Sequence, residues 1–192
     1  MAFYKAMSRL LLPLVLLASS CAAQAPVRVL VVYYSQTGNT EALAEAVREG
    51  AASVDGVDAA LRKVDEVTQE ELEAADGIAL GSPVYMGDAA PAVREAAVRW
   101  ANDFGFWDSR ARQNKAGAVF ATGAFPSNGK EFTMWSMGQT MLQFGMVLVS
   151  PYGSVGASAT TVAPDRGVDN VEKRIARELG VRLAKTARRM RD

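Results

Sequence analysis

The sequence predicts an α/β fold in which a doubly wound parallel sheet of five strands carries helices on both faces. Three observations support this prediction. Short apolar segments alternate along the chain with segments of helical periodicity, the order typical of βα units. The first of them, Val27–Tyr33, is apolar along nearly its whole length, as expected for a strand buried on both faces. The chain has 192 residues, the length of one domain.

The strands are assigned from β-favouring residues bounded by turn residues. Gly145 separates the last strand from the helix before it. The predicted strands are Val27–Tyr33, Val57–Val64, Gly77–Gly81, Ala116–Thr122 and Met146–Pro151. The stretch from Gly81 to Ala90 contains Pro83, Gly87 and Asp88 and therefore predicts a loop.

The helices are assigned from apolar stripes and from start signals. Thr68 and Glu71 form a capping-box pattern that opens a short helix, and Pro91 suits the first turn of the next one. The remaining predicted helices are Gly38–Ser53, Glu131–Phe144 and a last helix from Val171 to Asp192. Each crossover between parallel strands is expected to be right-handed, and ligands of such sheets bind beyond the carboxyl ends of the strands.

Residues 1–25 have the pattern of a signal peptide, and the domain is expected to span residues 26–192. Lys5 and Arg9 precede an apolar run from Leu10 to Ala18 that is too short for a membrane span of about 20 residues. We therefore expect an exported protein, located in the bacterial periplasm or anchored to a membrane.

The chain has one cysteine, Cys21, which follows the apolar run directly. The segment resembles the lipobox of bacterial lipoproteins, although Ala18 stands where that family usually has leucine. This resemblance implies acylation of Cys21 and a lipid anchor. Ordinary cleavage near Ala23 or Ala25 is the alternative.

The charge and the composition exclude several classes of function. Removal of Lys5 and Arg9 from the 21 basic residues leaves 19 against 21 acidic residues, a net charge of −2. This balance gives no support to nucleic-acid binding. The chain has no histidine, which excludes a Ser-His-Asp triad and any zinc site that contains histidine, and no metal site is expected. No side chain is assigned a catalytic role, so the chemistry must come from a cofactor.

The loop after the first strand is suited to a phosphate group. It leads directly into a helix, whose first N–H groups and positive dipole end attract anions. Its hydroxyl and amide groups add neutral donors, and its glycine lets the backbone bend around an anion. The predicted phosphate-binding residues are Ser35, Gln36, Thr37, Gly38, Asn39 and Thr40. The glycine patterns of nucleotide triphosphatases and dinucleotide-binding folds are both absent.

This loop resembles the phosphate loop of flavodoxins, Ser/Thr-x-Thr-Gly-Asn-Thr. The segment Gly81–Gly87 is similar to a loop of flavodoxin-like quinone reductases. Phe104–Trp107 and the stretch from Thr122 to Glu131 are similar to the same subgroup, the NAD(P)H:quinone oxidoreductases first described as tryptophan-repressor-binding proteins. The resemblance covers Val27 to Met190. It implies a flavodoxin-like sheet with strand order 2-1-3-4-5 and flavin mononucleotide (FMN) as the cofactor.

The resemblance also assigns further site residues. The loop residues expected to contact the flavin ring are Pro83, Val84, Tyr85, Met86 and Gly87, and those expected at its polar edge are Thr122, Gly123 and Ala124. Trp107 matches a tryptophan that lies near the flavin, often one held by a neighbouring subunit; the alternative is a core aromatic residue. The resemblance implies NAD(P)H as co-substrate, a quinone as acceptor, and a homo-oligomer, either a dimer or a tetramer.

Two segments depart from the subgroup's pattern. The subgroup has a histidine that contacts the flavin, and the corresponding stretch here, Gln143-Phe144-Gly145, has none. The subgroup also has a run of glycines where this chain has the bulkier segment Ala124–Asn128. Two other functions therefore stay open beside the reductase: a one-electron carrier of the flavodoxin type, and a cell-envelope lipoprotein without redox activity.

Overall fold

The parallel sheet is the centre of the structure, a computed structural model that describes residues 25–108, 114–162 and 166–191. The strands in the middle of the sheet pair in the order β2-β1-β3-β5, and β6 and β7 both lie beside β5. These strands are β1 (Val27–Tyr33), β2 (Val57–Lys63), β3 (Gly77–Tyr85), β5 (Ala116–Gly123), β6 (Val147–Leu148) and β7 (Ala157–Thr160). The predicted α/β fold and strand order are thereby confirmed.

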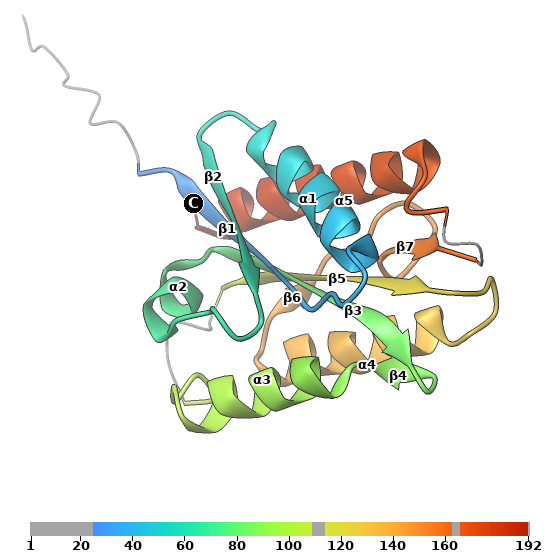
Figure 1. The fold of residues 1–192 in the computed structure, drawn as a ribbon. Coiled ribbons are helices and arrows are strands. Elements are labelled where there is room, and N and C mark those ends of the chain that lie inside the picture. The colour runs from blue at the N-terminus through green and yellow to red at the C-terminus, as the bar shows by residue number, and fades with distance from the viewer. Residues whose placement is uncertain (1–24, 109–113, 163–165, 192) are drawn as a thin grey trace, which may run out of the picture.

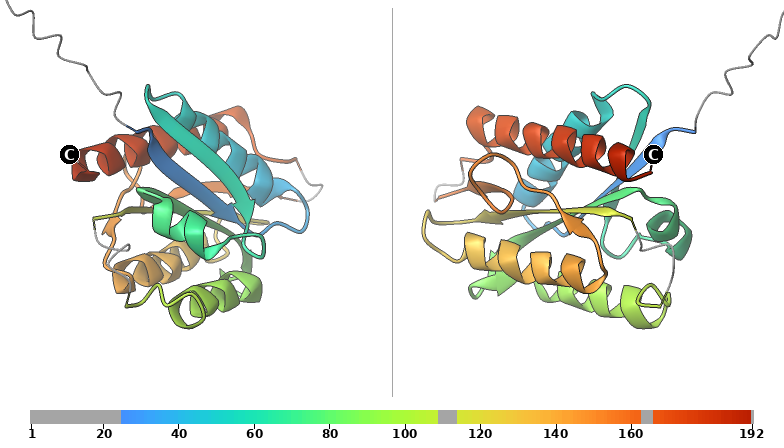
Figure 2. Two further views of the ribbon diagram at one scale, coloured as in Figure 1. Left: turned by 90° about the vertical axis from the view of Figure 1, so that its left-hand side faces the viewer. Right: turned by 180° about the vertical axis from the view of Figure 1, so that it is seen from behind.

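Helices cover both faces of the sheet, so the molecule has three layers (Figures 1 and 2). One face carries α1 (Asn39–Ala52) and α5 (Asn170–Arg191), and the other carries α3 (Pro91–Asn102) and α4 (Lys130–Gln143). The short α2 (Gln69–Ala74) begins with the predicted capping box. Side chains of β1 alternate between the two cores, with Val29 and Val31 in the first and Leu30 and Val32 in the second. This alternation explains why that strand is apolar throughout.

The fifth strand differs from the prediction Met146–Pro151. Only Val147–Leu148 pairs with the beginning of β5; the chain then leaves the sheet, and Ala157–Thr160 pairs with the end of β5. Pro151 has no amide hydrogen to continue the ladder, which favours this departure. Where the chain returns, Gly156 lies so close to β5 that a Cβ atom there would stand 2.0 Å from the Val119 carbonyl oxygen.

The predicted loop from Gly81 to Ala90 is largely a hairpin. β3 continues to Tyr85 and the chain turns back as β4 (Asp88–Ala89), paired antiparallel with the end of β3. The two turn residues, Met86 and Gly87, have φ values of 51° and 83°. A two-residue turn with positive φ at both positions matches the twist of the strands it joins, which periodicity alone does not reveal.

The two ends of the described chain meet at the amino edge of the sheet. The Arg191 guanidinium donates a hydrogen bond of 2.9 Å to the carbonyl oxygen of Pro26, just before β1. No helix in the described ranges is both long and apolar enough to cross a membrane. Residues 1–24, including Cys21, lie outside the described residues, so the signal peptide and lipidation stay predictions.

The backbones of α1 and α5 touch where each helix has a glycine. A Cβ atom at Gly180 would lie 2.0 Å from the Val47 carbonyl oxygen, and one at Gly50 would lie 2.0 Å from that of Arg177. Backbone atoms cannot move aside as the end of a side chain can. The close packing of this helix pair therefore depends on the two glycines.

Substitution Gly180→Ala is expected to lower the free energy of unfolding by about 1–3 kcal/mol, because the methyl group forces the two helices apart. Gly138→Ala in α4 is the matched control, since its Cβ atom would meet only the flexible end of Leu148 at 3.2 Å. Alanine there gains up to about 1 kcal/mol of helix propensity. Urea denaturation measures both variants, and an equal loss of stability would contradict this account.

Candidate functional site

Three loops meet at the carboxyl edge of the sheet because β1, β3 and β5 are neighbours. Tyr33 pairs in register with Gly81, and Pro83 pairs with Thr122. The segments that follow these strands are the predicted phosphate loop (residues 34–40), the β3–β4 hairpin and the loop after β5 (residues 124–129). Parallel sheets bind their ligands at this edge, so these loops form the candidate site.

The phosphate loop has the geometry of an anion-binding turn. Gly38 caps α1 in the left-handed region, with φ 88°, and its N–H donates to the Ser35 hydroxyl at 3.1 Å. The Asn39 side-chain amide donates to the Thr37 hydroxyl at 3.2 Å. Gln36, Thr37 and Gly38 are exposed, and α1 begins immediately after them. The loop thus presents polar groups and a helix N-terminus to an incoming phosphate.

A buried hydrogen bond joins the phosphate loop to β5. The hydroxyls of Thr40 and Thr122 lie 2.8 Å apart, and the two residues are 1% and 3% exposed. These residues are 82 positions apart in the chain. The Thr122 side chain therefore connects two parts of the site.

A second contact joins the phosphate loop to the β3–β4 hairpin. The Tyr85 hydroxyl donates to the side-chain oxygen of Gln36 at 2.7 Å, and its ring meets Tyr34 edge-on with centroids 6.3 Å apart. The Ser82 hydroxyl donates to the Pro83 carbonyl and accepts from the N–H of Ala90, both at 2.8 Å, and so fixes the base of the hairpin. Val84 is half-buried, and Met86 and Gly87 are exposed at the tip.

The loop after β5 packs closely against its neighbours. A Cβ atom at Gly123 would lie 2.4 Å from the Asn128 side chain, and one at Gly129 would lie 2.8 Å from the Gly87 carbonyl oxygen. Ala124 is exposed beside them. The predicted Thr122 and Gly123 end β5 directly before this loop, whereas Trp107 lies away from all three segments.

The acidic side chain in the first turn of α1 is held by a tyrosine. The Tyr33 hydroxyl donates to the Glu41 carboxylate at 2.7 Å. Burial, followed by the interaction with Glu41, raises the pKa of Tyr33, so its hydroxyl keeps its proton and remains a donor. In the described part of the chain, no three His, Cys, Asp or Glu residues lie close enough to hold a metal ion.

Sequence reasoning missed one buried charge at this edge, that of Lys130. Its ammonium group donates to the carbonyl oxygens of Phe125 and Pro126 and to the Thr160 hydroxyl. The available signal was a lysine at the first position of a helix, where the dipole disfavours a cation.

Trp107 lies at the opposite edge of the sheet, beyond the end of α3. It is 44% exposed, whereas the neighbouring Phe106 is 1% exposed, so Phe106 is the core aromatic residue. Both rings contact Phe144, with centroids 5.1 Å apart for Phe106 and 6.4 Å for Trp107. Phe144 is buried at the end of α4. The stretch Gln143-Phe144-Gly145, which stands where the resemblance expects a histidine, therefore provides a core contact through Phe144.

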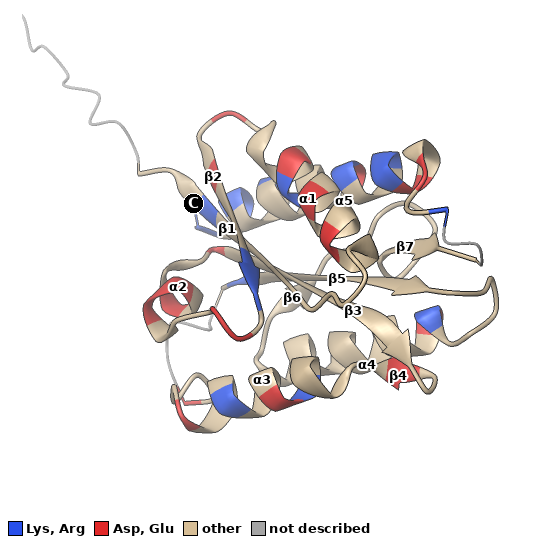
Figure 3. Cartoon of the chain, viewed as in Figure 1, with Lys and Arg blue, Asp and Glu red and all other residues tan. Residues whose placement is uncertain are grey.

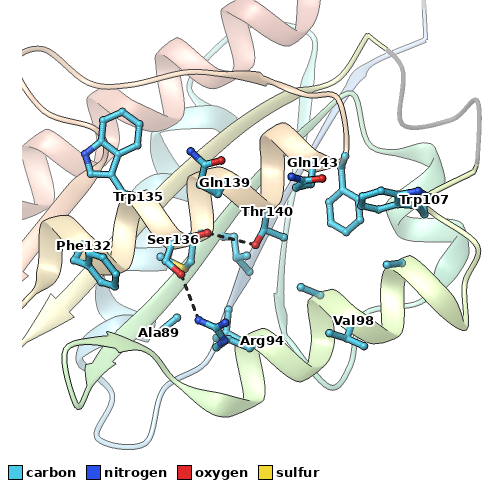
Figure 4. Close-up of a pocket in the computed structure, with 16 residues that line it drawn as sticks. Ala89, Arg94, Val98, Trp107, Phe132, Trp135, Ser136, Gln139, Thr140 and Gln143 are labelled. Carbon is cyan, nitrogen blue, oxygen red and sulfur yellow. Dashed lines mark hydrogen bonds between the residues drawn. The ribbon is translucent and has the colours of Figure 1, made fainter.

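A groove of about 540 Å³ runs between α3 and α4 and ends at Trp107 (Figure 4). Phe132 and Trp135 line its other end, and Arg94 reaches Asp88 at 2.6 Å and Ser136 at 3.4 Å. Its lining includes Ala89 of β4 but no residue of the phosphate loop or of the loop after β5. The groove and the phosphate loop are thus separate features.

The hydrogen bond between Thr40 and Thr122 is expected to make the effects of substituting the two residues interdependent. Thr40→Val or Thr122→Val alone leaves a buried hydroxyl without this partner and should cost about 1–3 kcal/mol. The double variant should cost less than the sum of the two single variants, because neither hydroxyl remains. A double-mutant cycle by urea denaturation measures this coupling; simple additivity would contradict it.

The comparisons with known proteins agree with this geometry. The family model described as Flavodoxin matches residues 31–160. The chain is 32% identical to a flavodoxin from Aquifex aeolicus, over 82% of this chain and 85% of that protein. It is 34% identical to an NAD(P)H dehydrogenase (quinone) from Syntrophobacter fumaroxidans, over 68% of this chain and 75% of that protein.

A solved structure supports the same assignment. The flavodoxin, WrbA-like protein from Agrobacterium tumefaciens superposes with a TM-score of 0.72 at 28% identity, covering 85% of this chain and 98% of that one. Membership of this family implies a flavin cofactor, and the phosphate loop of Ser35–Thr40 has the donors to hold one. The chain belongs to the flavodoxin family.

Proposed function

We propose that the protein is an FMN-dependent NAD(P)H:quinone oxidoreductase. The observation that carries this proposal is the assembly of three loops at one sheet edge, joined by the Thr40–Thr122 and Tyr85–Gln36 hydrogen bonds. The names of relatives support the reductase, because the protein from Syntrophobacter fumaroxidans is an NAD(P)H dehydrogenase (quinone).

The phosphate loop binds by neutral groups. Hydroxyls, amides and the N-terminus of α1 would face the phosphate of FMN, and the loop has no lysine or arginine. The hairpin supplies an apolar and aromatic wall through Val84, Tyr85 and Met86, and the loop after β5 supplies backbone donors and acceptors. An isoalloxazine ring needs both kinds of surface.

When bound, FMN would supply the two-electron redox chemistry between the nicotinamide and the quinone. The protein's part is to bind, orient and shield. This division suits a chain that has no histidine to act as an acid or a base.

The exposed face of α3 and α4 is proposed as a contact between copies of this chain. Phe132, Trp135 and Trp107 are 64%, 51% and 44% exposed along the groove. α4 has no charged residue after Glu131 (Figure 3). An apolar surface of this kind marks an interaction site. Because Trp107 lies at the amino edge, it can contact a flavin only if another copy holds that flavin.

We also propose that the chain is exported and anchored at Cys21. The described chain begins at the amino edge of the sheet, beside the end of α5, so an anchor placed there leaves the candidate site at the opposite edge. The intact mass of the protein extracted from membranes, compared with that of Cys21→Ala, reports whether acyl chains are attached.

The reductase is tested with purified full chain reconstituted with FMN and mixed with NADH or NADPH without oxygen. Bleaching of the flavin, reversed by a quinone, is the expected result; no bleaching with either nucleotide would sink the proposal. Reduction by light in two separate one-electron stages would favour the carrier. Protein that does not quench FMN fluorescence would favour the lipoprotein without redox activity.

Substitution Gly38→Ala is expected to weaken FMN binding about five- to thirtyfold, because alanine disfavours the left-handed conformation at φ 88° by about 1–2 kcal/mol and so shifts the loop. Gly56→Ala is the control: its φ is 69°, and it lies at the amino edge. Fluorescence titration should give the wild-type dissociation constant for Gly56→Ala. Equal binding by both variants would contradict the assigned role of Gly38.

Trp135→Glu is expected to dissociate the oligomer, because a carboxylate in the apolar contact loses its hydration. Sedimentation velocity should show a dimer or tetramer for the wild type and a monomer for the variant. Val171→Glu, at an apolar position of α5 that is 55% exposed, is the control and should sediment like the wild type. A Trp135→Glu protein that keeps the wild-type mass would place the contact elsewhere.

A further inference from the structure

Lys130 is a buried cation without an ion-pair partner among the described residues. It is 3% exposed, and its ammonium donates to the Phe125 carbonyl at 2.8 Å, the Pro126 carbonyl at 3.1 Å and the Thr160 hydroxyl at 2.8 Å. Burial lowers the pKa of Lys130 and outweighs the opposing effect of Glu131 and Glu172. A charge in this place, at the positive end of α4, is unfavourable by itself and calls for a functional reason.

The acceptors of Lys130 all belong to the edge that forms the candidate site. Phe125 and Pro126 lie in the loop after β5, and Thr160 pairs in register with Gly123. Because C=O and N–H point in opposite directions across a trans peptide, the bond to the Pro126 carbonyl turns the Ser127 N–H away from the ammonium. That N–H donates to no acceptor within the described residues, and Ser127 is exposed. Lys130 therefore sets which groups the loop presents outward.

We propose that Lys130 is a positioning residue for the polar edge of the flavin, holding the loop after β5 and favouring the reduced cofactor by its charge. The inference rests on the proposed function, since it requires FMN at this edge. Reduction adds two electrons and one proton to bound FMN, and the product carries a negative charge. A fixed positive charge nearby stabilises that product more than the neutral ring of oxidised FMN.

The test is the midpoint potential of FMN bound to the full chain, titrated with dithionite against a reference dye at neutral pH. Lys130→Met and Lys130→Gln should each weaken binding of reduced relative to oxidised FMN about tenfold, which lowers the two-electron potential by about 30 mV. Lys130→Gln removes the positive charge but keeps N–H donors for the loop carbonyls. It therefore distinguishes the effect of the charge from the effect of the hydrogen bonds on the loop. Lys130→Arg keeps the charge and should restore a potential close to that of the wild type.

Lys115 provides a matched control at the other end of β5. It is 5% exposed, its ammonium donates to the carbonyl oxygens of Glu73 and Ala75, and burial lowers its pKa to about 8. Lys115→Met should lower the stability of the protein in urea and leave the potential of bound FMN unchanged. This variant measures what the loss of a buried ammonium does to the fold alone.

An unchanged potential in both neutral Lys130 variants, with only a loss of stability like that of Lys115→Met, would overturn the inference. A wild-type chain that binds no FMN would overturn both the inference and the proposed function. The inference and the proposed function can otherwise be tested separately, because dithionite reduces bound FMN without NADH or NADPH. A shifted potential together with no bleaching by NADH or NADPH supports the role of Lys130 and rejects the reductase.

Discussion

Parallel pairing of β1, β3 and β5 is the constraint on which the rest of the structure depends. It places three loops from distant parts of the chain at the carboxyl edge of the sheet. There the Thr40–Thr122 hydrogen bond connects the phosphate loop to the end of β5. It also buries β1 on both faces, so that helices must cover both. The phosphate loop is useful only because this pairing brings the hairpin and the loop after β5 beside it.

The close packing of the site is achieved with residues that are unfavourable in isolation. Met86 adopts a positive φ at the hairpin tip, and Lys130 is buried at a helix N-terminus. Each has a local cost that the fold must offset, and both lie beside the proposed flavin position. Residues of this kind are not confined to the site, because Asn114 has a φ of 61° and Lys115 is buried at the opposite edge.

The loops at the carboxyl edge of the sheet and the groove between α3 and α4 have different proposed functions. The phosphate loop offers the proposed cofactor neutral groups, and flavin-borne chemistry suits a chain without histidine. The groove between α3 and α4 presents aromatic side chains and contains no residue of the phosphate loop or of the loop after β5. The proposed cofactor site and the proposed contact between copies thus lie on different surfaces, which separate variants can test.

The sequence by itself determined the α/β class, most element positions and the polar composition of the phosphate loop, because periodicity and turn residues act locally. The expected strand order came from the resemblance to flavodoxins. It did not reveal the interruption of the fifth strand between Leu148 and Ala157, which depends on pairing with β5. Nor did it reveal the hairpin at Met86, whose turn depends on backbone dihedrals. Only the tertiary structure brought Lys130 under the loop after β5 and placed Trp107 at the opposite edge. Contacts between distant residues decide such features, and no local pattern records them.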